Sequence, residues 1–328
     1  MTTPTLPASR AATRAAAALR PPPRHLLSAG DFAGLGIDGL LDRAQGLRRD
    51  RHRGRHAPLL AGRQVALLFD KPSLRTRVSF EVGIQQLGGN AIFLAPEEVQ
   101  LGRREPAADV GRNLSRWVDA IVVRCSDPRT IRALAAAASV PVINALDDGE
   151  HPCQALADML TLRQHLGDLS GHALAYVGDG NNVCHSLLLA AALAGMRVRV
   201  GTPDGHAPSP DIVAAARRLG AARGGSVQVG SDPAWAVEGA DAVYTDVWTS
   251  MGFESQAEAR RARFVPYQVN DALLARAPDA LVMHCLPAHR GEEITASVLD
   301  GPRCVALDQA ENRLYAQQAL LVRLLTPR

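Results

Sequence analysis

Two hydrophobic patterns alternate along the chain from residue 65 onward. Short runs of Val, Ile, Leu and Ala, bounded by Asp, Gly, Pro or Asn, are typical of buried strands. Longer segments between them repeat apolar residues at helical spacing, as helices packed on a sheet do. The predicted strands are residues 65–69, 91–94, 120–123 and 140–144 in the first half, and 173–177, 198–200, 227–229, 242–245, 281–284 and 304–307 in the second.

Helices are predicted between these strands, at residues 73–87, 106–117, 131–138, 152–166, 183–193, 211–219, 233–237, 271–275 and 309–325. Strands that alternate with helices in this way form parallel sheets. The predicted fold class is therefore α/β, with two doubly wound parallel-sheet domains. Because ligands of such sheets bind at the carboxyl ends of the strands, we expect the active site in the cleft between the domains.

The break between the domains is expected near residues 148–152, where a long helix begins. We expect one domain over residues 28–150 and a second over 151–308, with the C-terminal helix 309–328 packing back on the first. Residues 1–27 are expected to be a disordered tail, because Pro21, Pro22 and Pro23 would break a presequence helix. A mitochondrial transit peptide is the alternative for residues 1–24. The arginine-rich residues 47–56 are expected to form a solvated loop.

Composition excludes several classes of protein. Of the 328 residues, 47% are hydrophobic and 21% are charged, as in a globular protein. The 36 Lys and Arg nearly balance the 33 Asp and Glu, which argues against a general nucleic-acid binder. No apolar run approaches the about 18 residues of a membrane span. The 5 cysteines are widely spaced without a CxxC pair, which indicates a reducing compartment and a cytoplasmic location.

The first predicted strand is followed by a segment suited to a phosphate dianion, Asp70-Lys71-Pro72-Ser73-Leu74-Arg75-Thr76-Arg77. A helix that begins at Ser73 presents free N–H groups and a positive dipole end. The hydroxyl groups of Ser73 and Thr76 and the guanidinium groups of Arg75 and Arg77 add donors and charge. An ordinary capped helix with surface arginines is the alternative. The spacing is not that of a Walker loop, so a nucleoside triphosphate is not predicted.

Two further segments of the first half carry candidate donors. Arg124 ends a predicted strand, which by itself is a weak signal. His151 and Gln154 flank the start of the helix at the domain break, where Pro152 suits the first helical position. A helix N-terminus favours a neutral imidazole, which can donate a hydrogen bond to a carbonyl oxygen.

In the second half, polar residues again follow strands. The glycine-rich segment 178–182 lacks GxGxxG spacing, so a nicotinamide site is not predicted. Asp246 ends one strand, and His284 and Cys285 end another. We expect Cys285 to reach the cleft, where positive neighbours would favour its thiolate. A buried, inert thiol is the alternative.

A metal site is a minor alternative for a set of His and Cys residues. Their spacing fits no standard zinc pattern. Consecutive strand residues such as His284 and Cys285 are also expected to point to opposite faces. The candidates are His151, Cys153, His284, Cys285 and His289.

Taken together and in this order, four motifs resemble the aspartate/ornithine carbamoyltransferase family, especially its ornithine-accepting members. They lie at residues 69–77, 151–154, 246–252 and 284–291, and the resemblance covers roughly residues 28–328. It implies transfer of a carbamoyl group from carbamoyl phosphate to an amine. It also implies a homotrimer with shared active sites, in which Gln100 is the glutamine that a neighbouring subunit contributes, and a place in arginine metabolism without a cofactor or metal.

The resemblance also assigns residues to roles. The catalytic residues would be Cys285, Asp246, His151 and Arg124. The acceptor L-ornithine would be held by Asn182, Asp246, Ser250 and Met251. Carbamoyl phosphate would be held by Ser73, Leu74, Arg75, Thr76, Gln100, Arg124, His151, Gln154, Cys285, Leu286 and Arg313.

One residue departs from the family pattern: Leu74 stands where Thr is more frequent, which matters little if this position donates through its backbone N–H. Asp246 favours an acceptor with an α-ammonium group. N-acetylornithine, putrescine and aspartate are alternative acceptors, and a non-catalytic carbamoyl-phosphate-binding protein is the alternative of another class. Neither nucleic acid nor a membrane is an expected partner.

Overall fold

The computed structural model of the protein describes residues 25–249 and 257–326. Leu26 is fully buried, and its N–H donates to the carbonyl oxygen of Val142 at 2.9 Å. The prediction of a tail over residues 1–27 is therefore wrong for Leu26, which is part of the fold, whereas residues 1–24 lie outside the described residues. None of the helices described is both long enough and apolar enough to span a lipid bilayer.

The first sheet is parallel and has the strand order β2-β1-β3-β4. Side chains alternate along β1: Val65 and Leu67 pack with Phe80 of α4, while Ala66 and Leu68 face α6 and α7. The strands are β1 (Gln64–Phe69), β2 (Asn90–Leu94), β3 (Ala120–Arg124) and β4 (Val142–Leu146), and the helices are α4 (Leu74–Gln86), α5 (Pro96–Val99), α6 (Ala107–Leu114) and α7 (Pro128–Ala137).

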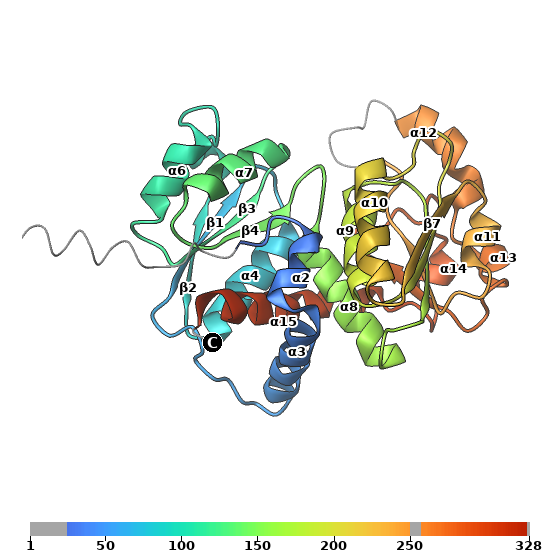
Figure 1. The fold of residues 1–328 in the computed structure, drawn as a ribbon, viewed down its shortest axis with the longest axis horizontal. Coiled ribbons are helices and arrows are strands. Elements are labelled where there is room, and N and C mark those ends of the chain that lie inside the picture. Colours follow the sequence, from blue (N-terminus) through green and yellow to red (C-terminus); the bar gives the residue numbers. More distant parts are fainter. Residues whose placement is uncertain (1–24, 250–256, 327–328) are drawn as a thin grey trace, which may run out of the picture.

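The second sheet is also parallel, with the order β7-β6-β5-β8-β9. Figure 1 shows the two sheets side by side, each with helices against it. The strands are β5 (Ala173–Val177), β6 (Arg197–Gly201), β7 (Ser226–Gly230), β8 (Ala242–Thr245) and β9 (Leu281–His284), and the helices are α9 (Asn182–Leu193), α10 (Pro210–Ala221), α11 (Pro233–Val237), α12 (Ala257–Phe264), α13 (Asp271–Leu274) and α14 (Ala296–Leu299), with the 3-10 turn η4 (Val265–Tyr267).

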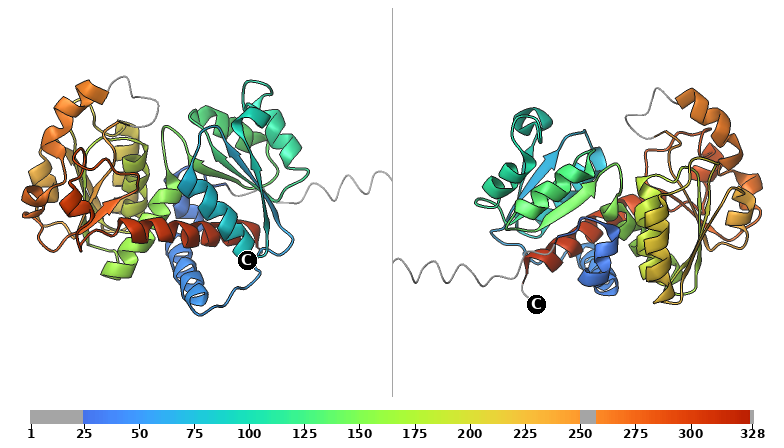
Figure 2. Two further views of the ribbon diagram at one scale, coloured as in Figure 1. Left: turned by 180° about the vertical axis from the view of Figure 1, so that it is seen from behind. Right: turned by 45° about the horizontal axis from the view of Figure 1, so that its top comes forward.

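Two long helices join the lobes: α8 (Pro152–Leu166) and α15 (Ala306–Leu325). In Figure 2, α15 runs from the second sheet across to the first. It packs against α8, α4 and α3 (Ile37–His52), and α3 follows the short elements η2 (Ala29–Asp31) and α2 (Phe32–Leu35). Gln318 of α15 donates to the Gly83 carbonyl oxygen of α4 at 3.2 Å. The C-terminal helix is thereby fastened to the first lobe.

The two parallel α/β sheets predicted from the sequence are confirmed, but two local predictions are wrong. Residues 304–307 are not a strand: only Cys304 bridges to β9, and α15 begins at Ala306. Residues 47–56 are not all loop, because α3 continues to His52. Arg48, Arg49 and Arg51 lie on this helix, whose buried stripe is Ile37, Leu40, Leu41 and Ala44, whereas Arg53 and Arg55 follow its end.

Candidate active site

A cavity of about 280 Å³ lies between the carboxyl ends of the two sheets. Parallel strands place the loops that follow them at one edge, which is why residues distant in sequence meet there. Its walls come from the start of α4, the ends of β3, β8 and β9, the starts of α8 and α9, and the middle of α15. The lining residues are Lys71, Pro72, Ser73, Leu74, Arg75, Thr76, Arg124, Leu146, Asp148, His151, Asn182, Val183, Asp246, Val247, Thr249, Cys285, Leu286, Pro287, His289 and Arg313.

The start of α4 forms one wall of this cavity. Ser73 is the N-cap residue in an extended conformation, and its side chain forms no capping hydrogen bond. The first N–H groups of a helix have no intrahelical acceptor, so they remain available to an anion together with the positive end of the dipole. The Leu74 side chain is 75% exposed. Leucine in place of the more frequent threonine therefore does not remove the backbone N–H groups that the start of α4 offers to an anion.

Two buried guanidinium groups meet at one threonine. Arg313 donates to Thr76 Oγ1 at 2.8 Å, and Arg124 approaches the same oxygen at 3.4 Å. Arg124 is 6% exposed and Arg313 is 3% exposed, and no acid among the described residues forms an ion pair with either. Burial, with Arg313 nearby, lowers the pKa of Arg124 to about 10. Since buried unpaired charge is costly, this wall is built for an anionic ligand.

His151 lies at the start of α8 beside these arginines, and Arg313 Nη1 is 3.4 Å from its Nε2. Burial and then the charges of Arg313, Arg124 and Arg75 hold the pKa of His151 well below its usual value of 6.5. These shifts favour the neutral imidazole that the sequence predicted, but through burial and neighbouring cations rather than through the helix end. Nε2 accepts from the guanidinium, so Nδ1 carries the proton. That Nδ1 is buried without a partner among the described residues and is a free donor.

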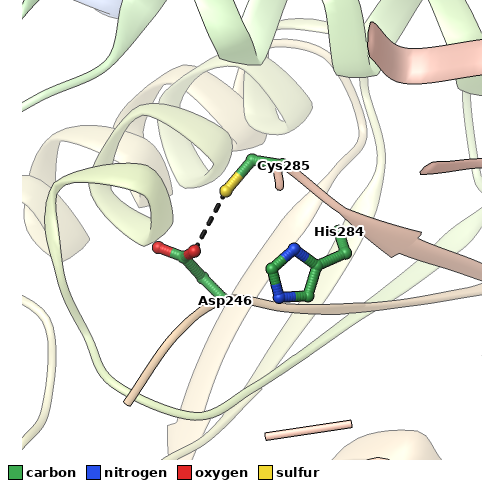
Figure 3. Close-up of side chains that lie close together, drawn as sticks. All are labelled: Asp246, His284 and Cys285. Atoms are coloured by element: carbon green, nitrogen blue, oxygen red, sulfur yellow. Dashed lines mark hydrogen bonds between the residues drawn. The ribbon is translucent and has the colours of Figure 1, made fainter. Parts of the chain in front are cut away.

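The opposite wall is acidic and carries a thiol (Figure 3). Cys285 Sγ donates to Asp246 Oδ1 at 3.0 Å, and Asn181 Nδ2 donates to Asp246 Oδ2 at 2.8 Å. Burial and the Asp246 carboxylate raise the pKa of Cys285 well above its usual value. The expectation that positive neighbours favour a thiolate is therefore wrong for this structure, because the nearest charge is negative. Cys285 is a neutral thiol that donates to Asp246.

The expectation that His284 and Cys285 point to opposite faces is also wrong. Strand β9 ends at His284, so the alternation of a strand does not extend to Cys285. One ligand atom each of Asp246, His284 and Cys285 lies within 4.8 Å of the others. Both ring nitrogens of His284 are used, however: Nε2 lies 3.1 Å from Glu293 Oε1, and Nδ1 accepts from the N–H of Leu286. This trio therefore offers a metal no free imidazole nitrogen.

Some predicted residues lie elsewhere. Gln154 is buried behind Arg313 rather than in the cavity wall, and its Oε1 accepts from Arg313 Nη1 at 2.8 Å. Gln100 is exposed and lines a separate cavity beside Asp70 and Lys71. The predicted acceptor residues Ser250 and Met251 lie outside the described residues.

The sequence analysis assigned Asn182 to the acceptor site but did not identify its neighbour Asn181, whose side chain contacts Asp246. Asn182 does line the cavity, and its Nδ2 donates to the Asp147 carbonyl oxygen at 2.6 Å. Asn181 holds the N-cap position of α9, where its Oδ1 accepts from the N–H groups of Val183 and Cys184. Its position before a helix predicted an N-cap residue, but that role does not predict a contact with an acid at the end of another strand.

Comparison with known proteins gives consistent matches along both lobes. Residues 24–164 match the carbamoyl-P binding domain of aspartate/ornithine carbamoyltransferase, and residues 170–324 match its Asp/Orn binding domain. An ornithine carbamoyltransferase of Acidothermus cellulolyticus is 54% identical over 299 residues, which are 91% of this chain and 95% of the relative.

Solved structures agree with these sequence matches. The ornithine carbamoyltransferase from Pyrococcus furiosus superposes with a TM-score of 0.90 at 47% identity, covering 93% of this chain and 97% of its own. An acetylornithine transcarbamylase complexed with acetylcitrulline superposes with a TM-score of 0.83 at 31% identity, covering 93% of this chain and all (100%) of its own.

Proposed function

This chain belongs to the aspartate/ornithine carbamoyltransferase family and is a carbamoyltransferase, and we propose that it carbamoylates the δ-amine of L-ornithine. The products are L-citrulline and phosphate. The observation that carries the proposal is the pairing of walls in one cavity. Across it, two buried arginines with no acidic partner in the described part of the chain face an acid and a neutral thiol.

Carbamoyl phosphate suits the cationic wall. Its phosphate dianion would bind the start of α4 at Ser73, Leu74, Arg75 and Thr76, where N–H groups and the helix dipole favour negative charge. The carbonyl oxygen would lie toward Arg124 and the free Nδ1–H of His151. Binding of the anion offsets the cost of burying the charges of Arg124 and Arg313, for which the described residues supply hydrogen bonds but no acidic partner.

The reaction places charge where this wall can stabilise it. The lone pair of the neutral δ-amine attacks the carbonyl carbon, the bond from that carbon to the bridging phosphate oxygen breaks, and the proton that the nitrogen loses ends on the released phosphate. Negative charge grows on the carbonyl oxygen and then leaves with the phosphate. Donors already aimed at such charge need no reorganisation, and the loss of one typically costs about 3 kcal/mol of barrier.

The acidic wall suits the acceptor. Each carboxylate oxygen of Asp246 has a further lone pair beyond its bond to Cys285 or Asn181, so it can also accept from the α-ammonium of ornithine. Asn182 would add a polar contact from the start of α9, and Ser250 and Met251 are proposed to complete the acceptor site. Cys285 and Leu286 would lie next to the reacting carbon and nitrogen. Since the thiol is neutral, we assign Cys285 the task of positioning Asp246 and the amine.

The wider setting is also part of the proposal. Gln100 lies on the exterior of this chain, in a position suited to completing the site of a neighbouring subunit, and we propose a homotrimer with shared active sites. The five free cysteines support a reducing, cytoplasmic location. We propose that the first domain extends to residue 150 and includes the buried Leu26, that the second covers 151–308, and that the C-terminal helix belongs to the first domain; we also propose a role in arginine metabolism.

One assay tests the proposed function. Purified protein is given carbamoyl phosphate with L-ornithine, N-acetylornithine, putrescine or aspartate, and the carbamoylated product is measured. We expect product with L-ornithine at a kcat/KM well above the other three acceptors. A preference for another acceptor overturns the choice of ornithine. Calorimetric binding of carbamoyl phosphate without product from any acceptor overturns catalysis.

A further inference from the structure

Behind the cavity, one carboxylate joins the helices α8 and α15. Asp158 Oδ1 accepts from Gln154 Nε2 at 2.9 Å and from Gln309 Nε2 at 2.9 Å. Gln154 lies one turn before Asp158 on α8, and Gln309 lies one turn before Arg313 on α15. All four side chains are buried, with exposures between 0% and 3%. The junction is therefore shielded from bulk solvent.

The carboxylate decides which way both glutamine amides point. A glutamine amide has a donor end and an acceptor end, and its neighbours fix the orientation. An ionised carboxylate only accepts, so each amide turns its NH2 group toward Asp158. Each Oε1 must then point away from Asp158.

The two amide oxygens lead to opposite sides of the site. Gln154 Oε1 accepts from Arg313 Nη1 at 2.8 Å, and the same guanidinium donates to Thr76 on the cationic wall. Gln309 Oε1 accepts from the N–H of His284 at 2.9 Å, one residue before Cys285 on the acidic wall. One buried acid therefore reaches both walls through two glutamines.

We propose that Asp158 is a positioning residue for carbamoyl transfer, which holds Gln154 and Gln309 so that Arg313 and the His284–Cys285 backbone keep their places in the cavity. The proposal rests on the proposed function, because it concerns the same site. It assigns the effect to the hydrogen-bonding geometry of Oδ1 rather than to the charge of Asp158. Burial raises the pKa of this carboxyl to about 6, and both glutamines bond Oδ1 rather than the second oxygen, Oδ2. A proton can therefore occupy Oδ2 while Oδ1 keeps both bonds.

Two substitutions at this position separate geometry from charge. Asp158→Asn removes the charge but keeps Oδ1, which can still accept from both glutamines. Asp158→Ala removes the shared acceptor, so both amides are free to turn. Since a misplacement of about 1 Å at a reacting centre can cost about 100-fold, we expect kcat/KM to fall 10- to 100-fold for the alanine variant and only a few-fold for the asparagine variant.

Variants of the two glutamines test the link to Arg313 and the link to the His284–Cys285 backbone separately. Methionine has a similar length and volume without a polar end, so Gln154→Met and Gln309→Met are matched. We expect Gln154→Met to raise the Kd of carbamoyl phosphate, measured by calorimetry without acceptor. Gln309→Met should leave that Kd nearly unchanged and lower kcat. Asp158→Ala should do both, and adding Gln154→Met to it should raise the Kd little further, because the two residues act through one path.

A threonine at the same helix interface provides the structural control. Thr161 of α8 accepts from Asn312 Nδ2 of α15 at 2.9 Å, away from the cavity. Thr161→Val should lower the melting temperature without changing the Kd or kcat.

Equal losses in Asp158→Asn and Asp158→Ala would overturn the geometric role, as would full additivity with Gln154→Met or an unchanged Kd in a folded Asp158→Ala protein. If Asp158→Ala does not fold, the two methionine variants and Asp158→Asn test the proposal instead. The proposal is overturned if Gln154→Met and Gln309→Met change the Kd of carbamoyl phosphate and kcat in the same way. A wild-type protein that binds carbamoyl phosphate but forms no product refutes the proposed function alone.

Discussion

Thr76 is the residue at which the structure predicts a sharp effect from a small change. Its hydroxyl oxygen is fully buried and accepts from Arg313 at 2.8 Å and from Arg124 at 3.4 Å. Thr76→Val keeps the shape and removes the oxygen. The donors are charged, and a hydrogen bond of this kind contributes about 1.5–3 kcal/mol. The longer contact adds little, because hydrogen bonds weaken beyond about 3.2 Å.

The loss should appear in binding of carbamoyl phosphate. Without the threonine oxygen, the two guanidinium groups lose the acceptor that aligns them before the ligand arrives, and the hydroxyl proton is no longer available to the ligand. A loss of about 2 kcal/mol, at about 1.4 kcal/mol for each factor of ten, raises Kd about 30-fold. Calorimetric titration with carbamoyl phosphate, without acceptor, measures this change directly.

Two controls accompany this variant. Thr161→Val is the same substitution at another fully buried threonine, which lies on α8 outside the cavity, and its Kd should stay at the wild-type value. Thr76→Ser restores the oxygen and should recover most of the affinity. A folded Thr76→Val protein with wild-type Kd would show that the threonine oxygen does not organise the arginines, and the assignment of this wall to carbamoyl phosphate would lose its main support.

Four further tests concern the acidic wall and the imidazole. Cys285→Ala should lower kcat with little change in the Kd of carbamoyl phosphate, and equal kinetics would make the thiol a bystander. Because burial and Asp246 raise the pKa of Cys285, alkylation by iodoacetamide should be slow at pH 7 and faster as pH rises, which mass spectrometry can follow. Asn181→Ala frees one oxygen of Asp246 and should raise KM for ornithine more than it changes the Kd of carbamoyl phosphate. The pKa of His151 is lower in the folded protein than its usual 6.5, so neutral imidazole contributes fully to stability above pH 6.5, and this contribution is lost as pH falls below it. The free energies of unfolding of the wild type and of His151→Gln should therefore approach each other as the pH falls from 8 to 5. The kcat should show no loss centred at pH 6.5.

The sheets were predictable because central parallel strands are buried on both faces. Strand β5 is buried at every position, and its continuous apolar run gave the correct limits from sequence. Helix α8 was equally clear, since Pro152 marks its first turn and Gly167 follows its end. Both signals are local, so a single sequence carries them.

The errors arose where a local pattern has two solutions. Residues 304–307 are apolar, as a short strand is, but Val305 forms one backbone bond to Val282 and the chain then enters α15. In α3 the charged residues after Leu47 masked a buried stripe that begins at Ile37. Only packing against α15 and α8 selects a helix there.

The candidate site was predictable as a set of strand ends but not as a set of contacts. Arg313 meets Thr76 across 237 positions of sequence, and no periodicity encodes that meeting. The state of Cys285 was misjudged for the same reason. Its nearest charged group comes from Asp246, 39 positions away, and the sign of that charge reverses the effect on the thiol.

Helices α8 and α15 carry contacts that cross between the lobes, beside those of η2 and α2 with α9, and this helps a site shared by two sheets to keep its geometry. Helix α15 begins beside β9, where Gln309 holds the backbone of His284, and it ends against α4 through Gln318. Arg313 lies between these two attachments, one turn after Gln309. A shift of α15 relative to α8 would therefore move Arg313 and the end of β9 together. Because buried helix interfaces are close-packed and resist small displacements, the packing that stabilises the fold also sets the distance between the cationic and acidic walls.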